Sequence, residues 1–366
     1  MKIAVFCQSL VTDYNYPIAH FLRGLISEIQ KNHEVVVYEK EQNEPLSSTL
    51  KDYGKTPVNE YYRYYPQLNS VTYDYDSVAE CVKGFDLVLV HSGTDMVTLN
   101  ILTELKLKNS FRFVFYDDGF SFVDNLPLVC EMIVPVCDMV VVNCHYIREL
   151  YMKVMDGCDV EYLPYGIDLN VFHPRSAEKE QTAVLNLDWS DECSVEELEE
   201  FFIKPVRDLR IKASVYGSRY PRHVKKILAD HSIAYKGWLP SFKLPEVFAH
   251  YTTAVHLPAK DSLEVRAGSA SMRMLESIAS GIPVISAPWK NSEKVLTPAR
   301  DYLQAGDSYE MTHYILEMMN STLCEVISGH GLKLISSRHT CRLRAQELSL
   351  MLSRLINQHQ VLSGSL

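Results

Sequence analysis

The stretch SMRMLESIASGIPVISAP, residues 271–288, decides the type of fold that the chain can form. Leu275 and Ile278 lie at helical spacing, and Gly281 is the residue type that commonly follows the end of a helix. Pro283 then leads into the apolar run PVISA, which predicts a buried strand. A helix, a short turn and a buried strand form the repeating unit of a parallel sheet covered by helices.

Similar apolar runs recur along the chain and are separated by helical stretches such as residues 17–30. In the first half they are KIAVFC (2–7), EVVVYE (34–39), FDLVLVH (85–91), FRFVFYD (111–117) and DMVVVN (138–143). In the second half they are TAVLNL (182–187), KASVYG (212–217), AYKG (234–237), TAVHLP (253–258) and PVISAP (283–288). We therefore predict an α/β protein with two Rossmann-like domains, each a doubly wound parallel sheet.

The length of 366 residues suits two domains of ordinary size. The boundary falls where His173–Pro174 and the polar stretch RSAEKEQ interrupt the pattern. We predict an N-terminal domain over residues 1–175, a second domain over 176–335 and a C-terminal helix within 336–366. That helix has leucines and a methionine at helical spacing, and they form one apolar face.

Composition places the chain among soluble globular proteins, with 47% hydrophobic and 22% charged residues. No uncharged apolar run reaches the roughly 18 residues that a membrane span requires. The start, MKIAVFC, is too short for a signal peptide, so we expect a first strand and a cytoplasmic protein. The nine cysteines include no C-x-x-C pair. This pattern predicts reduced core thiols and no metal site.

The net charge of −10 is unevenly distributed. Residues 1–175 contain 14 Lys and Arg against 24 Asp and Glu, whereas the remainder contains 22 of each kind. The whole acidic excess therefore lies in the first half, where a long polyanion such as duplex DNA should be repelled.

The loops that follow the predicted strands lack the common nucleotide fingerprints. The first loop, CQSLVTDYNYP, contains no glycine, and neither G-x-G-x-x-G nor G-x-x-x-x-G-K-[ST] occurs in the chain. This argues against an ordinary NAD or FAD enzyme and against P-loop hydrolysis. No bound cofactor is expected.

Two stretches resemble motifs of retaining GT-B glycosyltransferases. YLPYGIDLNVFHP, residues 162–174, is similar to their linker motif, and residues 271–288 are similar to their E-A-x-A-x-G-x-P-V motif. The resemblance implies two domains that face a cleft, with the acceptor on the N-terminal one and a nucleotide sugar on the other. It also implies that Glu276 accepts hydrogen bonds from the donor's ribose, since a carboxylate accepts two hydroxyl donors at once. The alternative is that Glu276 has no part in binding the donor and is simply a negative charge favoured near a helix N-terminus.

A narrower resemblance extends over nearly the whole chain. Five blocks look like a bacterial and phage family of CgeB-like glycosyltransferases: SLVTDYNYPIAHFLRG, YGSRYP, YKGWLPSFKLPEVFA, SMRMLESIASGIPVISAPW and SRHTC. The resemblance implies that the C-terminal helix crosses back to the first domain. Two positions depart from the pattern. Gly268 stands where many retaining enzymes have Glu, with Glu264 out of register, and Leu187-Asp188 stand where a phosphate-side glycine is usual.

Cationic groups are expected beside the donor's diphosphate, because the charge of the leaving group grows during transfer. Arg219 and Arg273 are the candidates, with Lys243 as a weaker one; each is alternatively an ordinary surface cation. Arginine suits phosphate because its guanidinium group is planar and always charged.

The base of the donor is expected near Trp238 and Leu239, which follow a strand where this fold holds the base, although Trp238 is equally a core residue. Ser271, at the start of the Glu276 helix, completes the predicted donor site.

On the acceptor side, His91 and Asp117 end two predicted strands and are the predicted catalytic residues. Asp13 and His20, in or just after the first loop, are further candidates for orienting or deprotonating a hydroxyl. A histidine at a strand end is also often structural. The tyrosine-rich residues 53–76 either stack on a ligand or pack a surface segment, and packing is the simpler interpretation.

These features predict a hexosyl- or pentosyltransferase that moves a sugar from a nucleotide-diphosphate sugar to an acceptor hydroxyl. By resemblance the reaction retains configuration and needs no metal ion. The alternatives are an epimerase or hydrolase of the same fold, and a non-catalytic nucleotide-sugar-binding protein. The acidic first domain favours a neutral or weakly charged acceptor, such as a small molecule, a glycan or a protein. Hydroxymethylated phage DNA is the alternative acceptor.

Overall fold

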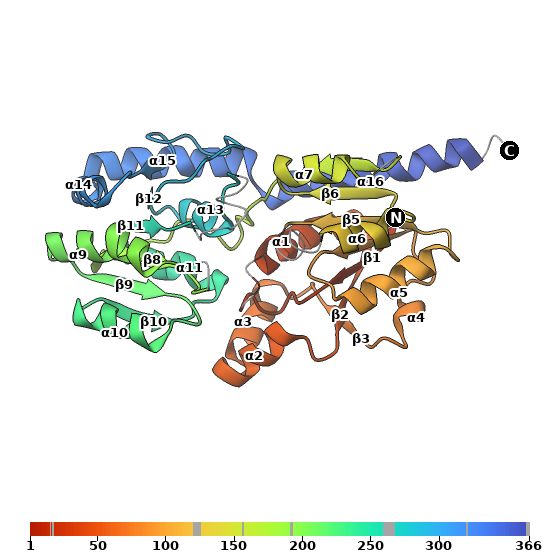
Figure 1. The fold of residues 1–366 in the computed structure, drawn as a ribbon, viewed down its shortest axis with the longest axis horizontal. Coiled ribbons are helices and arrows are strands. Elements are labelled where there is room, and N and C mark those ends of the chain that lie inside the picture. The colour runs from red at the N-terminus through yellow and green to blue at the C-terminus, as the bar shows by residue number, and fades with distance from the viewer. Residues whose placement is uncertain are drawn as a thin grey trace. The chain divides into compact units, whose positions relative to one another are not determined.

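The computed structural model describes residues 1–14, 16, 18–119, 126–155, 157–190, 193–258, 268–319 and 321–363. The chain divides into two compact units. Unit 1 comprises Met1–Gly166 and Cys341–Leu366, and unit 2 comprises Ile167–Thr340. The first division, after Gly166, falls nine residues before the predicted boundary at residue 175, and Figure 1 shows the helices and strands of both units.

Unit 1 is built on a seven-stranded sheet in the order β3-β2-β1-β4-β5-β6-β7, in which every pairing is parallel. The strands are β1 (Lys2–Cys7), β2 (Glu34–Lys40), β3 (Ser70–Tyr73), β4 (Leu87–His91), β5 (Arg112–Asp117), β6 (Met139–Val142) and β7 (Asp159–Tyr162). The helices are α1 (Ala19–Ile29), α2 (Glu44–Tyr53), α3 (Thr56–Tyr64), α4 (Val78–Cys81), α5 (Met96–Lys106), α6 (Leu126–Ile133), α7 (His145–Met152) and α16 (Cys341–Ser363).

The last helix, α16, packs against α1 in unit 1. Leu348 and Leu352 of α16 are 1% and 0% exposed, so the predicted apolar face of this helix is buried. His33 also meets Ser349 at 3.3 Å, and Arg354 pairs with Glu161 at 3.2 Å. The C-terminal segment thus belongs structurally to the unit that the N-terminus begins.

Unit 2 has a six-stranded parallel sheet in the order β10-β9-β8-β11-β12-β13. The strands are β8 (Gln181–Asn186), β9 (Ala213–Tyr216), β10 (Ala234–Gly237), β11 (Tyr251–His256), β12 (Val284–Ser286) and β13 (Leu303–Gln304). The helices are α8 (Val195–Leu198), the π-helix η1 (Glu199–Ile203), α9 (Lys204–Leu209), α10 (Arg222–Asp230), the 3₁₀ turn η2 (Ser241–Lys243), α11 (Leu244–Phe248), α13 (Met272–Ala279), α14 (Ser308–Met318) and α15 (Ser321–Arg338).

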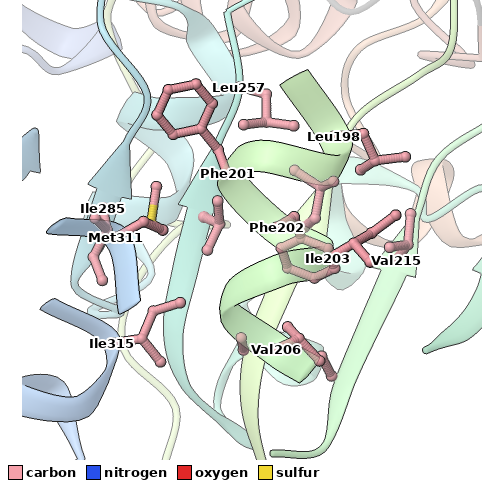
Figure 2. Close-up of a cluster of buried hydrophobic side chains, with 14 of the residues drawn as sticks. Leu198, Phe201, Phe202, Ile203, Val206, Val215, Leu257, Ile285, Met311 and Ile315 are labelled. Atoms are coloured by element: carbon pink, nitrogen blue, oxygen red, sulfur yellow. The ribbon is translucent and has the colours of Figure 1, made fainter. Parts of the chain in front are cut away.

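The core of unit 2 lies between the sheet and the helical segment 195–209 with α14 (Figure 2). Phe202 and Ile203 from η1 are fully buried, as are Val215 of β9 and Ile285 of β12. Burying one such side chain stabilises the fold by about 1.5–3 kcal/mol, which fixes the strands whose ends carry the polar loops. The segment begins where the hydroxyl of Ser194 accepts the Glu197 N–H at 3.3 Å and caps the helix.

Each sheet reverses its strand order beside its first strand. In unit 1 the order changes direction between β1 and β4, and in unit 2 between β8 and β11. Doubly wound sheets bind ligands beyond the carboxyl ends of the strands at such a point. The loops to inspect therefore follow β1, β4 and β5 in unit 1, and β8, β9 and β11 in unit 2.

Candidate functional site

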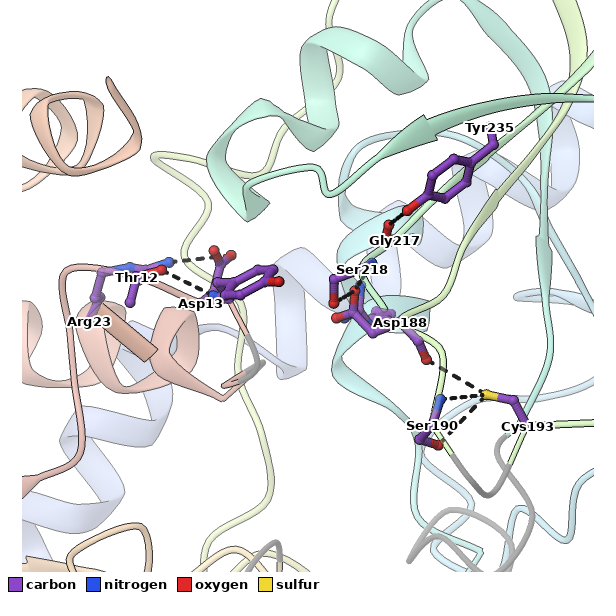
Figure 3. A network of polar contacts seen from close by, with 11 residues as sticks. Thr12, Asp13, Arg23, Asp188, Ser190, Cys193, Gly217, Ser218 and Tyr235 are labelled. Atoms are coloured by element: carbon purple, nitrogen blue, oxygen red, sulfur yellow. Dashed lines mark hydrogen bonds and ion pairs between the residues drawn. The ribbon is translucent and has the colours of Figure 1, made fainter. Parts of the chain in front are cut away.

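In unit 2, three polar side chains meet beyond the carboxyl ends of β8, β9 and β11, and Figure 3 shows two of them, Asp188 and Ser218. Asp188 follows β8, Ser218 follows β9, and Arg273 lies in the first turn of α13, the helix after β11. The backbone N–H of Ser218 donates to the Asp188 Oδ1 at 2.6 Å, and its hydroxyl donates to the same oxygen at 2.8 Å. Arg273 forms an ion pair with the other carboxylate oxygen through its Nη2. Asp188 thereby connects the loops that follow three strands.

The Asp188 carboxylate is largely buried and remains ionised. Burial alone would raise its pKa, but Arg273, the two donors of Ser218 and the charge of Arg219 together hold the pKa below its usual value. Its side chain is 11% exposed, and that of Arg273 is 22% exposed. Both charges are therefore present at neutral pH, and the cationic partner is the more accessible of the two.

The β8 and β9 loops also approach each other through the main chain. Leu187 and Trp189 donate their N–H groups to Tyr216 and Ser218 at 3.0 Å each. Gly217 has a φ of +142°, and a Cβ on it would lie 1.8 Å from the Leu187 carbonyl oxygen. Only glycine permits this approach.

Glu276 lies on α13, one helical turn after Arg273. It is 1% exposed, so it is a buried side chain and not an exposed charge at the helix start. Ser271 caps the helix by accepting the Met274 N–H at 3.2 Å. The predicted residues Ser271, Arg273 and Glu276 are thus brought together by a single helix.

The other predicted donor residues differ in their surroundings. Arg219 is exposed, and its φ of +61° is uncommon for a residue other than glycine. Trp238 is 9% exposed, which agrees with a core residue, and Leu239 is half-buried. Lys243 lies 3.9 Å from Glu246.

The two positions around the departure from the retaining motif are Glu264 and Gly268. Glu264 lies outside the described residues. Gly268 adopts a φ of +68°, a conformation that disfavours the glutamate usual at this position.

In unit 1, His91 is completely buried and hydrogen-bonded through both ring nitrogens. The Gly93 N–H donates to its Nδ1 at 2.9 Å, and the Tyr16 hydroxyl meets the same nitrogen at 2.9 Å. Its Nε2 lies 2.9 Å from the Asp118 Oδ2, and the Ser92 hydroxyl donates to the other oxygen of Asp118 at 3.0 Å. Tyr16 follows β1, so this contact spans the reversal point of the first sheet.

Asp117 has hydrogen-bond partners of its own. Its carboxylate accepts the Gly119 N–H at 2.7 Å and the Tyr151 hydroxyl at 2.8 Å. Burial raises the pKa of Asp117 to about 6, and the neighbouring carboxylate of Asp118 adds to the rise. His91 is therefore hydrogen-bonded to Asp118, whereas Asp117 is hydrogen-bonded to Gly119 and Tyr151.

The acceptor-side candidates of the first loop are also buried. Asp13 is 8% exposed and lies 3.9 Å from Arg23 (Figure 3). The guanidinium of Arg23 also donates to the Leu10 carbonyl at 2.9 Å. His20, in α1, is 4% exposed. Arg23 further lies over the ring of Tyr61 at 5.7 Å. The tyrosine-rich segment thus contributes to packing, as its simpler interpretation predicts.

Sequence reasoning missed Asp118 and Tyr16 as members of the polar group around His91. The available signal was the pair Asp117-Asp118 at the end of a buried strand, since consecutive side chains point to opposite faces.

All nine cysteines are free thiols, and six of them are buried. Within the described part of the chain, no group of three or more His, Cys, Asp or Glu side chains could hold a metal ion. A search of the same residues finds no helix that is long and apolar enough to span a membrane.

The comparisons with known proteins agree with this architecture. Residues 196–349 match the family model described as "Glycosyl transferase-like". No curated protein matches the chain in sequence.

Solved structures match the chain over nearly its whole length. The HepE protein of Anabaena in complex with UDP-glucose has a TM-score of 0.70 at 12% identity, covering 97% of this chain and 100% of that one. An alpha-glucosyltransferase in complex with UDP has a TM-score of 0.68 at 12% identity, with 96% and 100% covered. A DNA-modifying beta-glucosyltransferase has a TM-score of 0.60 at 15% identity, with 98% and 100% covered. This chain therefore has the GT-B fold of these glycosyltransferases, as predicted.

Proposed function

We propose that the protein is a glycosyltransferase that moves a sugar from a nucleotide-diphosphate sugar to an acceptor hydroxyl. The observation that carries this proposal is the arrangement on α13, where Arg273 and Glu276 lie one turn apart at the reversal point of the second sheet. A cation and a carboxylate at this spacing suit the diphosphate and the ribose of one nucleotide. The family match over residues 196–349 includes both side chains.

The donor roles follow from the chemistry of each side chain. Arg273 and Arg219 bind the diphosphate and stabilise its growing charge during transfer. Glu276 accepts hydrogen bonds from the ribose hydroxyls, and Ser271 holds the start of its helix. The base lies along Trp238 and Leu239, where backbone groups make the contacts. The matched structures of HepE and of the alpha-glucosyltransferase contain UDP-glucose and UDP, which favours a uridine donor here.

The acceptor is proposed to bind unit 1 beyond β1, β4 and β5. His91 is fully buried and hydrogen-bonded at both nitrogens, so its proposed role is to position the loops around Asp118 and Tyr16. The same loops are supported by three further buried side chains, those of Asp117, Asp13 and His20. The acidic excess of residues 1–175 favours a neutral or weakly charged acceptor. One matched alpha-glucosyltransferase was solved with a DNA 13-mer, so modified DNA is the alternative acceptor to test.

The two arginines supply the positive charge that a metal ion would otherwise provide, and on this ground we propose a metal-independent reaction. Retention of configuration rests on the two stretches that resemble motifs of retaining enzymes, and membership of the CgeB-like family rests on the five sequence blocks. We also propose that the protein is cytoplasmic. NMR of the product formed from an α-linked donor would establish its stereochemistry.

Donor binding is tested by a thermal-shift screen with UDP-, GDP-, ADP- and TDP-linked sugars and with the free diphosphates. A true donor at a hundredfold excess over its dissociation constant stabilises the fold by about 2.7 kcal/mol, which raises the melting temperature. The hit is then incubated with the enzyme alone. Release of free sugar without an acceptor would point to a hydrolase, binding without turnover to a non-catalytic protein, and no shift with any compound would contradict the proposal.

A further inference from the structure

The loop after β8 carries a carboxylate at the point where a ligand's phosphates approach in a doubly wound sheet. Asp188 lies two residues beyond the end of β8, and the strand order of unit 2 reverses at this strand. Anions are usually met there by backbone N–H groups and helix N-termini. An acidic side chain in this loop therefore needs a physical explanation.

The contacts of Asp188 show what the carboxylate does in the structure. One oxygen accepts two hydrogen bonds from Ser218, and the other meets Arg273, whose helix begins on the opposite side of the reversal point. A guanidinium carries five N–H donors, so one carboxylate oxygen does not saturate it. Arg273 remains 22% exposed and can offer its other donors to a ligand.

Resting on the proposed function, we propose that Asp188 is a positioning residue for the donor's diphosphate. It holds the Arg273 guanidinium and the Ser218 loop in the arrangement that receives the phosphates. The carboxylate fixes in advance a long side chain that would otherwise have to be ordered by the ligand.

Two effects of Asp188 on the diphosphate oppose each other. Its negative charge repels phosphate, but that charge is matched by Arg273 in contact and by Arg219 nearby. Free rotation of an arginine side chain is worth about 2 kcal/mol, which corresponds to roughly 30-fold in affinity. Since the repulsion is largely compensated, loss of positioning should dominate.

The test is Asp188→Asn, which preserves the size of the side chain and removes the ion pair. Calorimetry should show that a nucleoside diphosphate binds the variant roughly 10- to 30-fold more weakly, whereas the nucleoside alone binds as it does to the parent. In an Arg273→Ala background the same substitution should change diphosphate affinity less than twofold, because the residue to be positioned is absent. Asp208→Asn removes an exposed ion pair with Arg207 in the same unit and is the matched control.

The outcomes separate this inference from the proposed function. Equal or tighter diphosphate binding by Asp188→Asn would overturn the positioning role, as would additive effects of the two substitutions. Equal weakening of nucleoside and diphosphate would also overturn it, because that result indicates a general disturbance of the unit. A parent protein that binds neither ligand contradicts the proposed function itself. If Asp188→Asn does not fold, Asp188→Glu keeps the charge, displaces it by one methylene and should weaken the diphosphate selectively.

Discussion

The imidazole of His91 donates its Nε2 proton to the carboxylate of Asp118 across 2.9 Å. The direction follows from the other ring nitrogen, because the Gly93 N–H can only donate and therefore requires Nδ1 as the acceptor. Both residues are fully buried at the ends of neighbouring strands. The pair resembles the base and orienting carboxylate of many catalytic sites, but here the Nδ1 lone pair of the histidine faces the Gly93 N–H and the Tyr16 hydroxyl.

We expect nitrogen-detected NMR of the folded protein to show His91 as the neutral Nε2–H tautomer. Asp118→Asn should disturb this state, because an amide cannot accept the proton as strongly as a carboxylate. Protonation of Nδ1 in the parent protein would contradict the assignment.

His91→Ala should lower the free energy of unfolding by roughly 2–4 kcal/mol, since it leaves the buried Asp118 carboxylate and the Gly93 N–H without this partner. Nucleotide binding should persist, because the proposed donor residues all lie in unit 2. Urea unfolding and calorimetry measure the two effects separately. Loss of donor binding with unchanged stability would show that His91 acts on the nucleotide.

The raised pKa of Asp117 predicts a specific dependence of the free energy of unfolding on pH. Its folded-state pKa is raised to about 6 from a usual value of 3.8. The folded state therefore binds the proton more tightly, and its stability should fall as the pH rises from about 4 to about 6. The full effect is roughly 3 kcal/mol for a shift of this size.

The measurement is the free energy of unfolding in urea between pH 4 and pH 7, for the parent and for Asp117→Asn. The amide does not titrate, so the difference between the two curves isolates Asp117 from all other groups. The parent should lose stability relative to the variant across this interval. A constant difference would mean that Asp117 has an ordinary pKa in the folded protein.

The fold was predictable wherever a strand is buried on both faces. β1, β4, β5, β8 and β11 are continuous apolar runs, and each was found at nearly its observed bounds. The strands that the sequence did not reveal are β3, β7 and β13, and all three lie at the edges of their sheets. An edge strand such as DVEY is only partly covered, so its sequence has no continuous apolar run to mark it.

The candidate site was predictable along α13 and less so in the loops. Arg273 and Glu276 share a helix, so their proximity follows from spacing alone. The Asp188–Arg273 pair joins positions 85 residues apart, and no local pattern indicates such a contact. In unit 1, the choice between Asp117 and Asp118 as the partner of His91 depends on which face of β5 each side chain takes, and strand alternation decides it only when the register is known.

Gly217 and Gly237 form a matched pair for testing the close approach of the β8 and β9 loops. Both have positive φ values, so alanine costs roughly 1–3 kcal/mol of backbone strain at either position. Only Gly217→Ala also drives a Cβ into the Leu187 carbonyl, whereas a Cβ on Gly237 meets nothing within 4 Å. We expect Gly217→Ala to lose clearly more stability and to weaken diphosphate binding. Equal melting temperatures for the two variants would contradict the loop geometry.

Glu276→Ala should remove charge-assisted hydrogen bonds to the ribose worth about 1.5–3 kcal/mol, and so lower donor affinity roughly 10- to 150-fold. A deoxyribose nucleotide offers fewer hydroxyls, so it should lose less affinity on the same substitution. Glu246→Ala, which removes an exposed glutamate in the same unit, is the control. Unchanged donor affinity would assign Glu276 to the support of α13 alone.

The acceptor prediction rests on charge, and the structure sharpens it. Residues 1–175 carry ten net negative charges, and their densest basic set is Lys106, Lys108 and Arg112. Lys106 and Arg112 both pair with Asp138, at 2.8 and 2.5 Å, so two of these three cations are already matched. Protein groups that bind duplex DNA must neutralise several phosphates, and affinity then falls steeply as salt rises. We therefore expect sugar transfer to a neutral or weakly charged hydroxyl and none of comparable efficiency to DNA.

The assay for this acceptor prediction incubates enzyme and donor with hydroxymethylated DNA, with unmodified DNA and with neutral glycans at about 50 and 200 mM salt. Efficient transfer to hydroxymethylated DNA, diminishing with salt, would show that a local basic surface outweighs the mean charge of residues 1–175.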